Sequence, residues 1–98
     1  MTNTTNKILD ISVNLARVSD WILSESNQKQ ARVDQFLEET DQFIAEVANV
    51  SDSFKPTFER FKKEFNQLLK DRNNPNRYDW AEKALTWANI LSHRAKLA

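Results

Sequence analysis

The sequence contains no glycine, no cysteine and only two prolines among its 98 residues. At an average usage of about 7%, a chain of this length would carry roughly seven glycines. Glycine allows positive φ angles and close approach of the backbone to a phosphate, so its absence excludes the P-loop and the dinucleotide-binding fingerprint. The two-residue Asn-Gly and Asp-Gly hairpins of small all-β domains are excluded as well. Without cysteine, disulfide scaffolds and thiolate metal sites are also excluded.

An excess of one charge and a long hydrophobic run are missing too. The 14 basic and 14 acidic residues cancel, so the whole chain shows no bias toward nucleic acid or an anionic membrane. No apolar stretch approaches the roughly 18 residues of a membrane span. Residues 1–6 are polar and show neither the basic nor the apolar region of a signal peptide. We therefore expect a cytoplasmic protein with no transmembrane segment.

The residues that are present indicate a helical core. Leu, Ile, Val and Phe make up 25 of the 98 residues, and they recur at helical spacing with no sustained alternation of period two. We predict an all-α fold, a small antiparallel bundle of about four helices in one domain covering residues 1–98. The helices are expected at about 5–24, 28–49, 53–72 and 76–96. A domain this small buries only about 60 to 65% of its unfolded surface, which makes dimerisation unsurprising.

The segment 5–24 is apolar on two sides. One stripe follows the spacing of a helix seam and a second lies roughly opposite, so we expect a helix buried over most of its circumference. The stripes are Ile8, Ile11, Leu15, Val18 and Ile22, and Leu9, Val13, Ala16 and Leu23. The polar residues that follow shift the apolar phase, which favours a turn at Ser24 to Asn27. The alternative is one long helical rod over 5–49, completed by dimerisation.

The other two reversals are assigned to Ser, Asp, Asn and Pro. Residues 51–53 supply helix caps, and Pro56 falls in a first helical turn, where its missing N–H costs nothing. Residues 73–76 hold three asparagines and a proline, which we expect to provide left-handed conformations and caps. Asn76 and Asp79 resemble a capping arrangement at the start of the last helix.

The zero net charge conceals two oppositely charged halves. Before Ser53 there are 4 basic and 9 acidic residues, and from Ser53 onward there are 10 basic and 5 acidic residues. The candidate acidic surface is Asp34, Glu38, Glu39, Asp41 and Glu46, and the candidate basic surface is Lys55, Arg60, Lys62, Lys63, Lys70 and Arg72. We expect these surfaces to meet, within one chain or across a symmetric dimer, because opposed charges set orientation. Alternatively, the basic half contacts nucleic acid.

Six aromatic residues are candidates for protein contacts: Trp21, Phe54, Phe58, Phe61, Trp80 and Trp87. The phenylalanine stripe of 53–72 is best explained as core. With lysines on both flanks, it could also fill a partner's groove or lie on an anionic membrane. Trp21 falls in the polar arc of its helix, so we expect it to be exposed or at an interface.

No pattern for catalysis or metal binding rises above background. His93 is the single histidine, which excludes a zinc triad and a thiolate–imidazole pair within one chain, and the acidic residues of 28–49 are explained as a solvated face. We predict no catalytic residue, no metal and no cofactor. The expected function is non-enzymatic: a small helical assembly, adaptor or regulatory module that contacts proteins, including itself as a homodimer. A nucleic-acid-binding regulator is the alternative, and peripheral membrane association through 53–72 is third.

Overall fold

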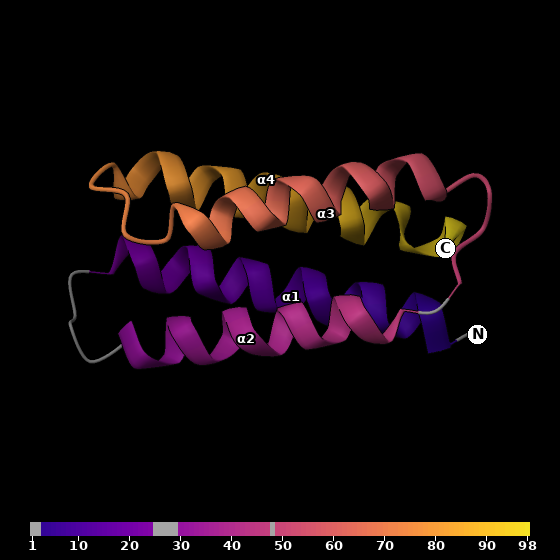
Figure 1. Cartoon of the computed structure of the whole chain (residues 1–98), viewed down its shortest axis with the longest axis horizontal. Helices are drawn as coiled ribbons and strands as arrows, with labels where there is room; N and C mark the ends of the chain where they lie inside the picture. The colour runs from indigo at the N-terminus through magenta and orange to yellow at the C-terminus, as the bar shows by residue number, and fades with distance from the viewer. Residues whose placement is uncertain (1–2, 25–29, 48) are drawn as a thin grey trace.

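The structure, a computed structural model, describes residues 3–24, 30–47 and 49–98, and these ranges contain four α-helices. The helices are α1 (Asn3–Leu23), α2 (Gln30–Glu46), α3 (Lys55–Lys70) and α4 (Arg77–Arg94), and α4 is followed by a short 3-10 helix, η2 (Ala95–Leu97). They run alternately up and down, with both termini at one end of the bundle (Figure 1). The predicted all-α bundle is confirmed. The second helix ends earlier than predicted, at Glu46 rather than near residue 49.

α1 and α2 form an antiparallel hairpin rather than a rod. Asn14 Nδ2 donates to Glu39 Oε1 at 3.2 Å, and Lys7 forms an ion pair with Glu46. From the first contact to the second, the position moves back seven residues along α1 and forward seven along α2, as antiparallel helices require. The predicted turn at 24–27 lies outside the described residues beyond Ser24.

The connection between α2 and α3 is tied to the C-terminal residues. The Ser51 N–H donates to the Ala98 carbonyl at 3.2 Å, and the Ser51 hydroxyl donates to the Leu97 carbonyl. Ser51 Oγ also accepts from the Phe54 N–H at 3.2 Å, just before α3 begins at Lys55. Pro56 lies in the first turn of α3 as predicted, but the cap position is Phe54, no side chain caps the helix, and α3 begins two residues later than residue 53.

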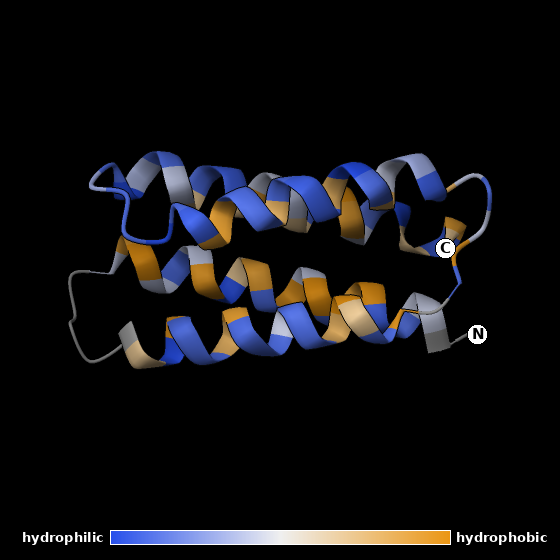
Figure 2. Ribbon diagram, viewed as in Figure 1, coloured by the Kyte–Doolittle hydropathy of each residue, from blue (hydrophilic) through white to orange (hydrophobic). Residues whose placement is uncertain are grey.

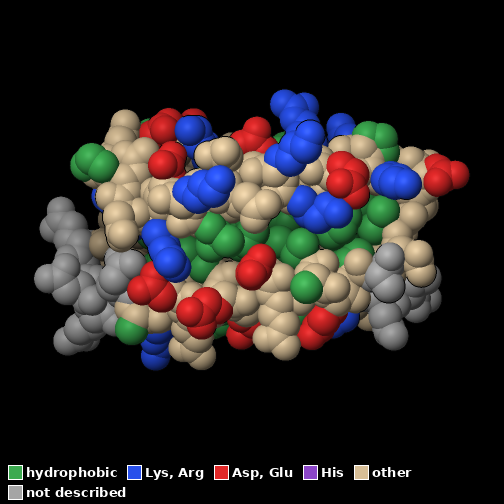
Figure 3. All heavy atoms as spheres, viewed as in Figure 1, with side chains coloured by type: hydrophobic (Ala, Val, Ile, Leu, Met, Phe, Trp, Pro, Cys, Tyr) green, Lys and Arg blue, Asp and Glu red, His purple; other side chains and the backbone are tan. Residues whose placement is uncertain are grey.

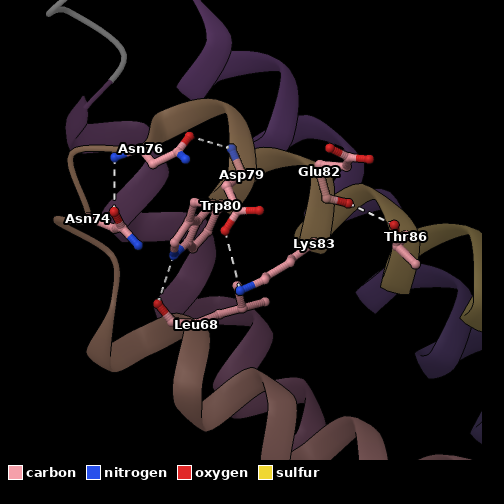
Figure 4. Close-up of polar contacts among 8 residues, drawn as sticks. All are labelled: Leu68, Asn74, Asn76, Asp79, Trp80, Glu82, Lys83 and Thr86. Atoms are coloured by element: carbon pink, nitrogen blue, oxygen red, sulfur yellow. Dashed lines mark hydrogen bonds and ion pairs between the residues drawn. The ribbon is translucent and has the colours of Figure 1, made fainter.

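The turn before α4 is made by asparagine side chains. Asn74 Oδ1 accepts from the Asn76 N–H at 2.9 Å, and Asn76 Oδ1 accepts from the Asp79 N–H at 3.0 Å (Figure 4). No described residue has a positive φ angle. The expectation that these asparagines adopt the left-handed conformation is therefore wrong, because their side chains supply the turn's hydrogen bonds while the backbone stays at negative φ.

We expect Asn76→Ala to lower the free energy of unfolding by about 1 kcal/mol, because it removes the acceptor for the Asp79 N–H at the start of α4. Urea denaturation monitored by circular dichroism measures the change. Asn73→Ala, at an exposed position in the same turn, is the control and should stay within about 0.5 kcal/mol of the parent. Equal effects of the two substitutions would contradict the capping role.

The core lies where the inner faces of all four helices meet, and Figure 2 shows apolar residues on the inward sides of the ribbons. The inner stripe of α1 is buried as predicted, but the second stripe is not: Leu9, Val13 and Leu23 are 37%, 47% and 51% exposed. The prediction that α1 is buried over most of its circumference therefore holds except on this outer side, because Ser12, Asn14 and Ser19 are buried as well as the inner stripe. α2 and α4 cover its two flanks, and its outer side faces solvent.

The four helices do not pack at equal distances. α1 and α4 approach most closely, because the buried residues of α4 on that side are small, Ala81, Ala84 and Ala88. The Ser19 hydroxyl can therefore reach across and donate to the Ala81 carbonyl at 2.8 Å. Large rings separate α3 from α4, with the Phe61 and Trp87 centroids 5.5 Å apart. α2 and α3 are not among the closely packed pairs.

Candidate interaction surface

Four of the six aromatic candidates lie in the core. Phe54 and Phe61 are 0% exposed, Trp80 is 1% exposed and Phe58 is 4% exposed. The phenylalanine stripe packs ring on ring along α3, with adjacent centroids between 5.8 and 6.4 Å apart. In the folded chain Phe54, Phe61 and Trp80 offer no surface to a partner or a membrane, and the rings hold α3 on the bundle.

The remaining two candidates are partly covered. Trp21 is half-buried because the hairpin brings Phe36 of α2 over its indole, with centroids 4.9 Å apart. The expectation of an exposed Trp21 is corrected accordingly, since the register of α1 against α2 cannot be read from α1 alone. Trp87 is half-buried between α3 and α4.

An open apolar strip runs between α2 and α3, and we call it the α2–α3 seam. Figure 3 shows hydrophobic side chains exposed along this strip, bordered in this view mostly by Lys and Arg on the α3 side and by Asp and Glu on the α2 side. It contains two adjoining hollows of about 240 and 340 Å³. The first is lined by Asp41, Ile44, Ala45, Lys62, Phe65 and Asn66. The second is lined by Val47, Asn49, Val50, Asp52, Lys55, Phe58, Glu59 and Lys62.

The acidic candidates divide between two sides of α2. Asp41 lines the seam, and Asp34 and Glu38 lie on the same side because they precede it by seven and three residues. Glu39 and Glu46 instead face α1, where they contact Asn14 and Lys7 respectively. No sequence pattern indicates these two α1 partners, because they depend on the register of the hairpin.

The basic candidates are dispersed in the same way. Lys55 and Lys62 are seven residues apart on α3, and both line the seam. Arg60 lies on the other side of α3 and lines a cleft against α4. Lys63, Lys70 and Arg72 are exposed. The predicted basic surface is therefore a set of separate positions around α3, of which Lys55 and Lys62 border the seam.

The charges on the two sides of the seam do not pair with each other. In the part of the chain that the structure describes, the ion pairs are Lys7–Glu46, Lys62–Glu59 at 2.9 Å and Lys83–Asp79 at 3.4 Å. Within one chain, acidic α2 thus forms no ion pair with the basic half over residues 3–24, 30–47 and 49–98. Hydrogen bonds from Lys7 and Lys62 lower the pKa of Glu46 and Glu59, respectively, below the ordinary carboxyl value.

A second cleft, of about 280 Å³, lies between α3 and α4. Its cations are Arg60, Lys83 and Arg94, next to the half-buried Trp87. Arg94 Nη1 donates to Thr57 Oγ1 at 2.9 Å, and Lys83 pairs with Asp79 (Figure 4). Because Glu64 also lines this cleft, carboxylates offset much of its positive charge.

The described ranges contain neither a cluster of metal ligands nor a membrane-spanning helix. No three His, Asp or Glu side chains among the described residues are grouped closely enough to hold a metal ion. The described helices include none with the length and apolarity needed to cross a bilayer. His93, on α4, is exposed.

Comparison of the chain with protein-family models, with curated proteins and with solved structures finds no match. The function is therefore inferred from the geometry of this chain.

Proposed function

We propose that this chain is a non-enzymatic binding module that contacts another protein through the α2–α3 seam. The observation that carries this proposal is the strip of half-buried apolar residues between α2 and α3, bordered by Asp41 on the α2 side and by Lys55, Glu59 and Lys62 on the α3 side. Burying such a strip supplies affinity in proportion to the apolar area removed from water. The charges on its borders set the orientation of the partner.

The half-buried residues of the seam support this role. Ile44, Val47 and Val50 pack against the core and also line the two hollows. Lys62 lies above the Phe58 ring, with Nζ 5.2 Å from the centroid, and its stem covers part of the apolar floor. A partner that displaces this stem would gain the apolar surface beneath it. The alternatives have less support, since the phenylalanines needed for membrane insertion lie in the core and the α3–α4 cleft mixes both charges.

Three variants test the proposal, and each carries one new arginine on a different surface. Ala45→Arg inserts a bulky cation into the seam at an exposed position, so the core stays intact. Gln35→Arg adds the same side chain to an exposed position of α2 outside both hollows. Val13→Arg adds it to the exposed side of α1. Association is measured by sedimentation of the purified chain and by affinity capture with the immobilised full chain.

We expect Ala45→Arg to weaken association about thirtyfold or more, as for a residue at the centre of an interface. Gln35→Arg and Val13→Arg should retain association close to that of the parent chain. Circular dichroism of all three variants checks that they stay folded. Loss of association in Val13→Arg but not in Ala45→Arg would place the interface on α1 and overturn the proposal. The proposal would also be overturned if the parent chain associated with no protein, itself included.

A further inference from the structure

We infer that the partner on the α2–α3 seam is a second copy of this chain, related by a twofold axis parallel to the helices. In this dimer, α2 of one protomer lies over α3 of its partner. The inference rests on the proposed function, because it names the occupant of the same seam.

The two borders of the seam are complementary to each other. Asp34, Glu38 and Asp41 lie on the α2 border. Lys55, Glu59 and Lys62 lie on the α3 border, which therefore keeps an excess of positive charge. A twofold rotation about an axis parallel to the helices exchanges the borders, so each acidic border meets a basic one. An axis in the interface plane but perpendicular to the helices would place α2 on α2 and bring like charges together. Charge complementarity therefore selects the parallel axis.

The seam charges are available for contacts between chains. Asp41 takes part in none of the ion pairs found among the described residues, although Lys62 lines the same hollow. Lys62 instead pairs with Glu59 on its own helix, which is a weak contact between exposed groups. Lys62 can therefore leave Glu59 and pair with Asp41 of a second copy at little cost in free energy. With a net charge of zero, two copies also approach without overall repulsion.

The size of the face suits a dimer. The bundle measures 39 × 20 × 19 Å, so a long face has a projected area close to the roughly 800 Å² that each partner buries in a standard interface. The seam runs along this long face, between two helices of 17 and 16 residues. A single partner helix would have to contact the acidic and the basic border with the same narrow surface. A second copy instead has one border of each charge, spaced as in the first copy.

Charge exchange tests the arrangement. The parent chain should sediment as a dimer at micromolar concentration, and its dissociation constant should rise with salt. Asp41→Lys and Lys62→Asp should each weaken the dimer about tenfold, because every dimer contains the altered contact twice. The double variant D41K/K62D should recover the parent affinity, because the borders are again opposite. With the perpendicular axis, the parent dimer should strengthen in salt and the double variant should show no recovery.

Spin labels give the orientation directly, and the cysteine-free sequence allows one label per chain. Asp52→Cys places the label at the end of the seam, at an exposed position. With the parallel axis, the two labels of a dimer should lie close together. With the perpendicular axis they should be separated by a distance comparable to the 39 Å length of the bundle. A label at Asn89→Cys, on the exposed side of α4, should give a long distance in the parallel dimer.

The outcomes separate this inference from the proposed function. A chain that stays monomeric, yet captures another protein in a manner lost in Ala45→Arg, overturns the dimer and leaves the seam as a binding surface. A dimer that does not respond to Asp41→Lys or Lys62→Asp overturns the arrangement. A monomer with no seam-dependent capture overturns both.

Discussion

Replacing Trp80 with alanine should lower the free energy of unfolding by about 3–5 kcal/mol. Trp80 is the largest fully buried side chain, 1% exposed at the start of α4. Its Nε1 donates to the Leu68 carbonyl near the end of α3 at 3.0 Å (Figure 4). The substitution removes the indole volume and leaves that carbonyl without this donor. Because small domains are stable by only about 5–15 kcal/mol, this loss is a large share of the total stability.

Urea denaturation followed by circular dichroism measures the effect. Trp80→Phe separates the two contributions, since it keeps most of the apolar volume and deletes only the donor, which should cost about 1–3 kcal/mol. Tyr78→Ala is the matched control on the same helix, because Tyr78 is 67% exposed, and it should change stability by no more than about 0.5 kcal/mol. A change below about 1 kcal/mol for Trp80→Ala would show that Trp80 does not link α3 to α4.

Replacing Ala84 with leucine should destabilise the chain by about 1–3 kcal/mol or more. Ala84 is 0% exposed on α4, the helix that approaches α1 most closely. The added carbons have no space to occupy unless the helices separate, and separation would break the hydrogen bond from Ser19 to the Ala81 carbonyl. The cost therefore arises from strain as well as from a lost polar contact.

Thermal and urea unfolding of Ala84→Leu measure this cost, and near-ultraviolet circular dichroism reports repacking around the tryptophans. Leu85→Ala is the control at the next position. Leu85 is 42% exposed, so its truncation removes little packing and should stay within about 0.5 kcal/mol of the parent. Parent-like stability of Ala84→Leu would mean that α1 and α4 can move apart freely.

The sequence predicted those features of the fold that depend on one helix at a time. The inner stripe of α1, from Ile8 to Ile22, is identified by spacing alone, and so is the phenylalanine stripe of α3. The outer stripe of α1 was misassigned because spacing shows that a side is apolar but not whether a neighbour covers it. Only the assembled bundle shows that α2 and α4 leave Val13 exposed.

The seam depends on several helices at once, so the sequence predicted its residues but not their grouping. Asp41, Lys55 and Lys62 were all candidates on charge grounds. Their position on one open face follows from the size of side chains elsewhere, because alanines on α4 let α1 approach closely while phenylalanines hold α3 farther away. Spacing along one helix contains no information on such differences between helix pairs.

The negative φ angles of every described residue also affect the unfolded state. Over the described residues the folded backbone does not enter the left-handed region and so gains nothing from glycine. A glycine-free chain also samples fewer conformations when unfolded. Each glycine replaced by alanine at a compatible position stabilises a protein by about 0.4–1 kcal/mol through this entropy. Compared with a chain of average glycine content, the free energy of unfolding is higher by about 3–7 kcal/mol. Part of this small bundle's stability thus comes from a reduced entropy of unfolding rather than from any contact in the folded state.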